Sequence, residues 1–344
     1  MDKWFAIPDS TKRNAYIQIA EKTGMAPFAV EKDWWVVQAL TVIFEMEIAN
    51  HLVFKGGTSL SKAWNLIERF SEDIDLAIDR RFFGFEGALS KRQIEKLRAV
   101  SNDYMVNVFY PELQKRFQEK GITKINWDIE KTDNAEEDPV KIYLYYPEVI
   151  ESPGYLEPRI QIEISCRSLR EPFTTKTFRS LIDEEYPEME FAQQHIEVQT
   201  VNPERTFLEK IFLLHEEFHR PIDKIRVTRL SRHLYDIYHL SNTEYAEKAI
   251  NDKELYETIV VHRHKFTRVG GVNYNEHNPQ AINPIPIPEV IETWKEDYKI
   301  MLEQMIYEEN KPSFEDIIYK LTELKEKINV LNWKLETEFP VPNN

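Results

Sequence analysis

The sequence predicts an α+β protein with a sheet and flanking helices in its first part and a helical second part. Strand-like runs at residues 51–54, 73–78, 122–129, 141–146, 159–166 and 196–201 all precede residue 202. From Pro203 onward, apolar residues recur at helical spacing almost to the end, with one loop rich in Gly, Asn and Pro at residues 270–288. We therefore expect two domains, residues 1–202 and 203–344, as suits a chain of 344 residues.

Charge and cysteine content exclude several classes of function. The chain carries 44 Lys and Arg against 59 Asp and Glu, a net charge of −15, so it has no general basic coat for nucleic-acid binding. Its single cysteine, Cys166, permits neither an intrachain disulfide nor a cysteine-cluster metal site. No signal-peptide pattern and no apolar run of about 18 residues is visible. These features predict a cytoplasmic protein with no membrane partner.

Local signatures predict the elements of the first part in order. Residues 10–21 and 27–46 are expected to form helices. The strand at 51–54 leads into two adjacent glycines, and apolar residues from Leu60 onward recur at helical spacing. A long polar stretch, residues 91–119, predicts a single helix before the later strands.

Asp73 and Asp75 stand two positions apart in the expected strand 73–78, so both carboxylates face the same side. Two neighbouring carboxylates repel each other unless a cation lies between them, and hard oxygen ligands suit Mg²⁺. By itself, an Asp-x-Asp pattern more often marks solvated acids on an edge strand. A metal site therefore needs support from neighbouring residues.

That support comes from Gly56-Gly57-Thr58-Ser59, which joins a strand to a helix upstream of the two aspartates. Glycine lets a phosphate approach the backbone, the helix N-terminus offers free N–H groups, and Ser59 adds a hydroxyl. A Gly-Gly pair can also mark an ordinary capped turn, but only 9 of the 344 residues are glycine. The combination of strand, glycine pair, helix and acidic strand predicts an anion cradle beside a metal site.

Glu163 is the candidate for a third carboxylate. In the strand at 159–166 three isoleucines face one side, whereas Gln161, Glu163 and Ser165 face the other. Glu163 could complete a site for two metal ions and activate a hydroxyl nucleophile. A solvated glutamate on an open sheet face is the alternative.

Two segments, KGGTSLSK at 55–62 and RFSEDIDL at 69–76, resemble the AbiEii and MenT family of nucleotidyltransferase toxins. Residues 31–36, 205–210 and 232–238 resemble further motifs of this family, so the resemblance covers nearly the whole chain. It implies a DNA polymerase β-like nucleotidyltransferase fold, with a mixed sheet and flanking helices followed by a helical domain. It also implies a type IV toxin–antitoxin or abortive phage-defence setting, and a cognate antitoxin as partner.

The family pattern implies that the two aspartates carry Mg²⁺ and that the glycine segment holds the triphosphate of a nucleoside triphosphate (NTP). The family often has Ser directly after Gly, whereas here Gly57 is followed by Thr58 and then Ser59, so either hydroxyl could meet phosphate. Lys210 and Asp236 match the later motifs, which implies that Lys210 contacts the triphosphate. The helical domain would thus contribute Lys210 and Asp236 to the cleft.

Together these features predict Mg²⁺-dependent transfer of a nucleoside monophosphate from an NTP to an acceptor hydroxyl. The predicted catalytic residues are Asp73, Asp75, Glu163, Lys210 and Asp236. The predicted nucleotide-binding residues are Gly56, Gly57, Thr58, Ser59 and Lys210. The resemblance points to the 3′ end of tRNA as acceptor, with growth arrest as the outcome; protein or self-modification is the second choice. A catalytically inactive protein that only binds nucleotide or antitoxin is an alternative from another class.

The segment HEEFH at 215–219 supports a different interpretation, because it matches the H-E-x-x-H pattern of zinc proteases. His215 and His219 would bind zinc, with Glu216 as the general base. Pro221 ends the helix immediately afterwards, and no third ligand follows at the usual spacing. A zinc metalloprotease is therefore an alternative function, and packing of two histidines on a helix face is the simpler explanation.

A local excess of positive charge marks the start of the helical part. Residues 205–268 contain 12 Lys and Arg against 10 Asp and Glu, although the whole chain carries −15. The candidate stripe for docking a polyanion such as tRNA consists of Lys224, Arg226, Arg229 and Arg232. A mixed-charge helical face is the alternative, in which Asp236 pairs with Arg232 or Arg229.

Overall fold

The computed structural model describes residues 3–71, 73–130, 140–152, 158–166 and 171–342. The chain divides into two compact units. Unit 1 comprises Met1–Asn65 and Phe70–Val201, and unit 2 comprises Leu66–Arg69 and Asn202–Asn344. The chain thus belongs to unit 2 for a short stretch just before the segment that carries Asp73 and Asp75.

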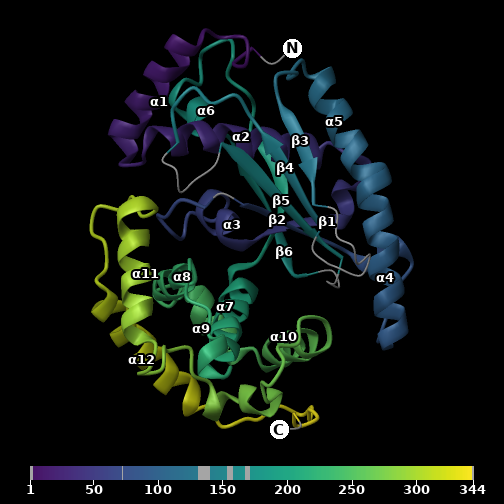
Figure 1. The fold of residues 1–344 in the computed structure, drawn as a ribbon, viewed down its shortest axis with the longest axis vertical. Helices are drawn as coiled ribbons and strands as arrows, with labels where there is room; N and C mark the ends of the chain where they lie inside the picture. Colours follow the sequence, from purple (N-terminus) through teal and green to yellow (C-terminus); the bar gives the residue numbers. More distant parts are fainter. Residues whose placement is uncertain (1–2, 72, 131–139, 153–157, 167–170, 343–344) are drawn as a thin grey trace. The chain divides into compact units, whose positions relative to one another are not determined.

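Unit 1 is built on a mixed sheet. Its helices are α1 (Asp9–Thr23), α2 (Pro27–Phe44), α3 (Gly56–Lys62), α4 (Lys91–Tyr104), α5 (Tyr110–Glu119) and α6 (Leu181–Glu185). Its strands are β1 (Leu52–Lys55), β2 (Asp73–Ile78), β3 (Asn126–Ile129), β4 (Val140–Tyr145), β5 (Arg159–Ser165), β6 (Phe173–Phe178) and β7 (Ile196–Val201). Among the described residues these strands form one sheet in the order β3-β4-β5-β2-β1-β7-β6 (Figure 1). The β2–β5 and β1–β7 pairs are parallel, and the other neighbours are antiparallel.

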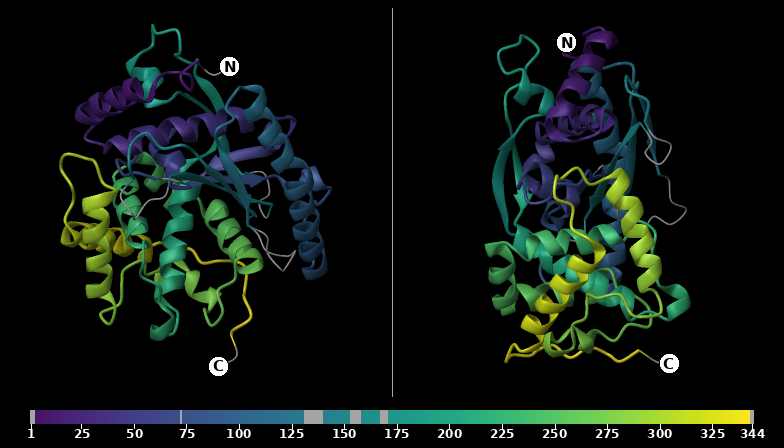
Figure 2. Two further views of the ribbon diagram at one scale, coloured as in Figure 1. Left: turned by 45° about the horizontal axis from the view of Figure 1, so that its top comes forward. Right: turned by 90° about the vertical axis from the view of Figure 1, so that its left-hand side faces the viewer.

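Alternation along the central strands gives the sheet one apolar and one polar face. Ile160, Ile162 and Ile164 of β5 are fully buried, as is Ile74 of β2. Helix α2, which is buried around most of its circumference, packs against β5 and β7 (Figure 2). Each fully buried side chain of this size contributes about 1.5–3 kcal/mol. The apolar face of the sheet therefore packs into the core, and the opposite face carries the polar side chains that could bind substrate.

Two elements of unit 1 differ from the sequence expectations. The predicted single helix at 91–119 is divided by a π-helical turn, Met105–Phe109, which separates α4 from α5. Strand β6 is present in the structure but is not among the strands predicted from the sequence. It lies at the edge of the sheet, and its sequence FTTKTF is largely half-buried or exposed, so it lacks the alternation of a central strand.

Unit 2 is helical, as the sequence predicts after residue 203. Its helices are α7 (Pro203–Phe218), α8 (Ser231–Leu240), α9 (Glu244–Asn251), α10 (Lys253–Phe266), α11 (Ile291–Gln304) and α12 (Phe314–Asn329). Helix α7 packs against α8, α9 and α10, and α8 packs against α11 and α12. The first helix begins with Pro203, whose fixed φ suits a helix start, and the last begins with a capping box between Ser313 and Asp316. The α+β class with a mixed sheet and a helical C-terminal region is confirmed.

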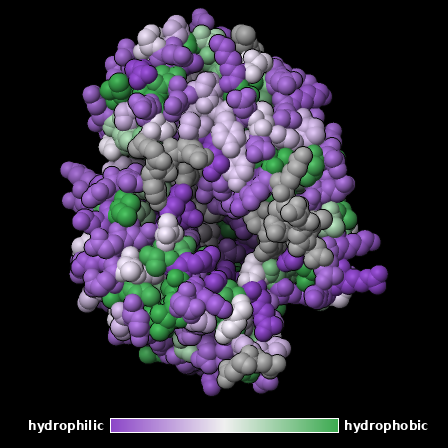
Figure 3. All heavy atoms as spheres, viewed as in Figure 1, coloured by the Kyte–Doolittle hydropathy of each residue, from purple (hydrophilic) through white to green (hydrophobic). Residues whose placement is uncertain are grey.

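Hydrophilic side chains cover most of the face drawn in Figure 3, and hydrophobic ones form small separate groups. The exposed large apolar side chains include Met189 in unit 1 and Val330 in unit 2. None of the described helices combines the length and apolar character that crossing a lipid bilayer requires.

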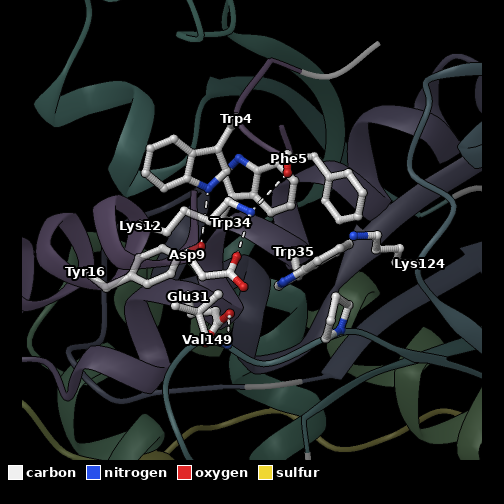
Figure 4. A pocket seen from close by; sticks show the side chains of 11 residues that line it. Trp4, Phe5, Asp9, Lys12, Tyr16, Glu31, Trp34, Trp35, Lys124 and Val149 are labelled. Carbon is white, nitrogen blue, oxygen red and sulfur yellow. Dashed lines mark hydrogen bonds and ion pairs between the residues drawn. The ribbon is translucent and has the colours of Figure 1, made fainter. Parts of the chain in front are cut away.

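A cavity of about 190 Å³ in unit 1 is bordered by the N-terminal segment, α1 and α2 (Figure 4). Aromatic side chains line it together with Glu31, which is only 2% exposed. The carboxylate of Glu31 accepts hydrogen bonds from the backbone N–H groups of Val149 (2.8 Å) and Ile150 (2.9 Å). Burial raises the pKa of Glu31 to about 7, against the opposing effect of these hydrogen bonds. Glu31 thus ties the loop after β4 to α2.

The buried carboxyl of Glu31 should make stability depend on pH. In the folded state the Glu31 carboxyl keeps its proton up to about pH 7, whereas in the unfolded chain this carboxyl releases it near pH 4.5. The free energy of unfolding of the wild type should therefore fall relative to Glu31→Gln, by roughly 3 kcal/mol, as pH rises between these values. Urea unfolding at several pH values measures this. Glu21→Gln, at an exposed position of α1, is the control and should show no such trend.

Candidate active site

The predicted carboxylates lie on two neighbouring strands. Asp73 and Asp75 belong to β2, and Glu163 belongs to β5. The parallel register places Asp73 beside Gln161 and Asp75 beside Glu163. Residues paired in this way share one face of the sheet and stand about 5 Å apart. The structure thus brings the three acids together on the polar face, where all three are half-buried.

Within this cluster, the pKa of Glu163 is shifted upward. Burial and the negative charges of Asp75 and Asp73 raise the pKa of Glu163 to about 7. The antiparallel partner of Glu163 on β4 is Lys141, whose positive charge opposes this effect. Gln161 donates a hydrogen bond of 2.7 Å to Glu163 Oε1. A carboxyl group with such a pKa can both accept and release a proton near neutral pH.

The donor chemistry of this cluster fits Mg²⁺, because all three side chains offer carboxylate oxygens. In the part of the chain that the structure describes, no three His, Cys, Asp or Glu side chains are gathered closely enough to enclose a metal ion. Mg²⁺ is usually bound by one or two carboxylates together with substrate phosphates and water rather than by a complete protein cage. Asp73 and Asp75 could supply that pair of carboxylates.

Gly56 is in direct contact with the acidic strand. The β1–β2 register sets Lys55 opposite Asp75, so Gly56 begins α3 beside that carboxylate. A Cβ atom at position 56 would lie 1.9 Å from Asp75 Oδ2, and Gly56 has a φ of +79°. Both facts require glycine here. The sequence predicts glycine here because it gives phosphate access to the backbone. In the structure, the Asp75 carboxylate fills the space where a Cβ atom of residue 56 would lie.

The hydroxyls of Thr58 and Ser59 are engaged with the backbone. Thr58 Oγ1 donates to the carbonyl oxygen of Asp73 at 2.5 Å, and Ser59 Oγ donates to that of Gly56 at 2.9 Å. Both side chains are buried. The Thr58 bond fixes the start of α3 to the start of β2. These hydroxyl protons are therefore used locally, and a phosphate contact by either side chain stays a prediction.

Asp236 and Lys210 meet in unit 2, together with a residue that the sequence did not single out. Asp236 is fully buried and forms a two-pronged ion pair with Arg69, with Nε–Oδ1 at 2.6 Å and Nη2–Oδ2 at 2.7 Å. Lys210 Nζ lies 2.8 Å from Asp236 Oδ2. Burial alone would raise the pKa of Asp236, but Arg69 and Lys210 outweigh it and hold this pKa well below its ordinary value.

This arrangement corrects the pairing suggested for Asp236. The expected partners were Arg232 or Arg229, on the same helix face, whereas the carboxylate is bound by Arg69 and Lys210. Arg69 lies in the segment RFSEDIDL that carries the family resemblance. This position is the sequence signal that could have identified Arg69 as a site residue. Asp236 has no exposed surface, and its carboxylate is engaged by both cations.

The H-E-x-x-H segment forms buried contacts within unit 2. Helix α7 ends at Phe218, so His219 lies beyond its last turn. Glu216 is held by Arg263 at 2.5 and 2.8 Å, and contacts His277 at 3.2 Å. His215 is fully buried and accepts a hydrogen bond at Nδ1 from the backbone N–H of Asn283. Glu216 is therefore half of a buried ion pair, which does not suit the general base of a zinc protease.

The predicted basic stripe is divided among several environments. Lys224 is exposed next to α8, and Arg226 is paired with the buried carboxylate of Glu217 at 2.6 Å. Arg229 has a positive φ of 64° and is half-buried, as is Arg232 on α8. Docking of RNA on these residues stays a prediction.

A mixed sheet with paired carboxylates on its polar face, next to a glycine-led helix start, is the arrangement of a nucleotidyltransferase. Residues 38–320 match the family described as nucleotidyl transferase AbiEii toxin of type IV toxin–antitoxin systems. The chain belongs to this family, and the predicted resemblance and enzyme class are confirmed.

One solved structure, MenT4, agrees with this fold. MenT4, a nucleotidyltransferase toxin from Mycobacterium tuberculosis H37Rv, shares 17% sequence identity, with 95% of this chain and 91% of that chain aligned and a TM-score of 0.55. JHP933 from Helicobacter pylori shares 13% identity over 87% of this chain and 91% of that chain, with a TM-score of 0.40. No curated protein matches the sequence.

Gly56→Ala should disturb the acidic strand, since the added Cβ would overlap the Asp75 carboxylate. Gly84→Ala is the matched control, because Gly84 has a similar φ of +78° and open space where its Cβ would be. The control should cost about 1–2 kcal/mol of unfolding free energy for the left-handed backbone, and Gly56→Ala clearly more. Equal losses in urea unfolding would contradict the contact.

Asp236→Asn should strongly destabilise unit 2, because it leaves the buried cations of Arg69 and Lys210 without their anion. We expect a loss of about 3–5 kcal/mol in the free energy of unfolding. Glu315→Gln is the control: it breaks the exposed ion pair with Lys295 and should change stability little. A small effect of Asp236→Asn in urea unfolding would show that the buried pair is dispensable.

Proposed function

We propose that this chain is a Mg²⁺-dependent toxin that transfers a nucleoside monophosphate from an NTP to a hydroxyl at the 3′ end of an RNA, most simply tRNA. The observation that carries the proposal is the register of β2 and β5, which sets Asp75 beside Glu163, while Asp75 is also in contact with the Gly56 helix start. This arrangement places metal-binding oxygens and a neighbouring carboxyl group on one face of the sheet.

In the proposed reaction, the acceptor hydroxyl attacks the α-phosphorus of the NTP. A bond forms between the acceptor oxygen and phosphorus, the bond from phosphorus to the bridging oxygen breaks, and pyrophosphate leaves. Glu163, which stands beside Asp75 on the neighbouring strand, accepts the hydroxyl proton. Mg²⁺ at Asp73 and Asp75 would orient the phosphates and neutralise their charge.

Lys210, which lies in a segment resembling a motif of the family, is also proposed to contact the triphosphate. Arg69 and Lys210 are buried cations, and both bind the carboxylate of Asp236. Burial lowers the pKa of Lys210, and the attraction of Asp236 offsets this only in part. The negative charge of a triphosphate would stabilise the ammonium group of Lys210.

The proposed setting is that of the family: a cytoplasmic toxin whose activity arrests growth or aborts phage infection, restrained by an antitoxin. RNA is favoured as acceptor because the helical part carries a local excess of Lys and Arg on an otherwise acidic chain. Lys224, which is exposed, and Arg226, whose side chain is 59% exposed despite its ion pair, are the accessible members of that group.

Asp73→Asn and Asp75→Asn should each reduce transfer of labelled NTP to total RNA at least about a thousandfold, because each removes a charged metal ligand. The matched control is Asp128→Asn, which alters an exposed acid on β3 of the same sheet and should transfer at the wild-type rate. Undiminished transfer by folded Asp73→Asn would refute the carboxylate mechanism. NTP binding without pyrophosphate release by the wild type would instead indicate an inactive nucleotide-binding protein.

A further inference from the structure

Two tyrosines extend the polar face of the sheet away from the carboxylates. Side chains alternate along β4, so Tyr143 and Tyr145 share the face of Lys141 and are half-buried. The register sets Tyr143 opposite Gln161, and Gln161 opposite Asp73. Tyr143 therefore stands in the same row as Asp73, two strands away, at roughly 10 Å.

Arg159 joins these tyrosines into one cluster. Its position on β5 is opposite Tyr145. The guanidinium carbon of Arg159 lies 4.5 Å from the ring centre of Tyr143, and Nη1 donates to Tyr145 Oη at 3.4 Å. The two tyrosine rings are 6.4 Å apart at an angle of 42°. Tyr143, Tyr145 and Arg159 form what we call the tyrosine–arginine cluster.

The hydroxyl of Tyr143 is fixed and neutral. It donates a hydrogen bond of 2.9 Å to Glu130 Oε2, and Lys141 pairs with the same carboxylate at 3.3 Å. Burial and the hydrogen bond with Glu130 raise the pKa of Tyr143 to about 12. A neutral aromatic ring held in place with its neighbouring guanidinium is a surface on which a planar base can stack.

The position of the cluster relative to Asp73 and Asp75 indicates which base it meets. The Gly56–Gly57 helix start lies on the β1 side of β2, whereas Glu163 and the tyrosine–arginine cluster lie on the β5 and β4 side. In phosphoryl transfer the attacking and leaving oxygens stand roughly in line on opposite sides of phosphorus. If pyrophosphate leaves toward Gly56, the acceptor hydroxyl arrives from the side of Glu163 and the cluster.

We propose that the tyrosine–arginine cluster stacks the terminal base of a single-stranded RNA acceptor and so places its 3′ hydroxyl beside Glu163. This proposal rests on the proposed function, since it takes the acceptor to be RNA. Stacking on aromatic and guanidinium planes tolerates every base, so the cluster would bind the end of the strand without reading its sequence.

The test compares Tyr143→Leu with Tyr143→Phe. The first removes the aromatic ring and keeps apolar volume; the second keeps the ring and loses only the hydroxyl. Binding of a short labelled single-stranded RNA with a free 3′ hydroxyl is measured by fluorescence anisotropy without NTP. We expect the dissociation constant to rise about tenfold in Tyr143→Leu and to stay within about twofold of wild type in Tyr143→Phe.

Further variants separate stacking from misfolding. Arg159→Gln should weaken RNA binding in the same direction as Tyr143→Leu, and Tyr319→Ala, which alters a 68% exposed tyrosine of α12, should not change it. Thermal unfolding and NTP binding with Ca²⁺ in place of Mg²⁺ should match wild type in all four variants. In transfer assays the KM for RNA should rise in Tyr143→Leu while the KM for NTP stays unchanged.

Each contrary result has one meaning. A rise in the KM for NTP with unchanged RNA affinity would place the NTP base on the cluster and overturn the proposal. In another outcome, the wild type transfers nucleotide while Tyr143→Leu binds RNA as tightly as the wild type does. That result would overturn the stacking proposal and leave the proposed reaction intact. Ring-dependent RNA binding by a protein that transfers no nucleotide would support the cluster and refute the proposed reaction.

Discussion

The parallel pairing of β2 with β5 determines where the side chains on the polar face of the sheet stand. A register slip of one residue would turn every side chain of one strand to the opposite face. Such a slip would expose Ile74 of β2 or the isoleucines of β5, which are fully buried against the core. Hydrophobic burial therefore holds Asp75 beside Glu163, although the two carboxylates repel each other.

The carboxylates of Asp75 and Asp236 are held in place in two different ways. The Asp75 carboxylate occupies space that only a glycine at position 56 leaves open, so it depends on a missing Cβ atom. Asp236 is fully buried and instead depends on two charged partners, Arg69 and Lys210. The first arrangement is steric and constrains position, while the second is electrostatic and constrains ionisation.

The sequence predicts local and periodic features of this protein well. Alternation places Asp73, Asp75 and Glu163 on the polar sides of their strands, and helical spacing identifies the second part. The sequence does not predict the register between β2 and β5, which arises from packing between distant segments. The same limit applies to Arg69 and Asp236, which are separated by 167 positions. Strand β6 escapes prediction because an edge strand carries little alternation.

The assignment of Leu66–Arg69 to unit 2 has a consequence for synthesis on the ribosome. Domains generally fold from the N-terminus as the chain emerges. The segment directly before β2 forms its two-pronged ion pair with Asp236, and its backbone also meets Ile306 and Tyr307. Arg69 therefore lacks this partner until Asp236 has emerged. A product truncated after residue 201 would carry the carboxylates of the sheet and Arg69, but not Asp236.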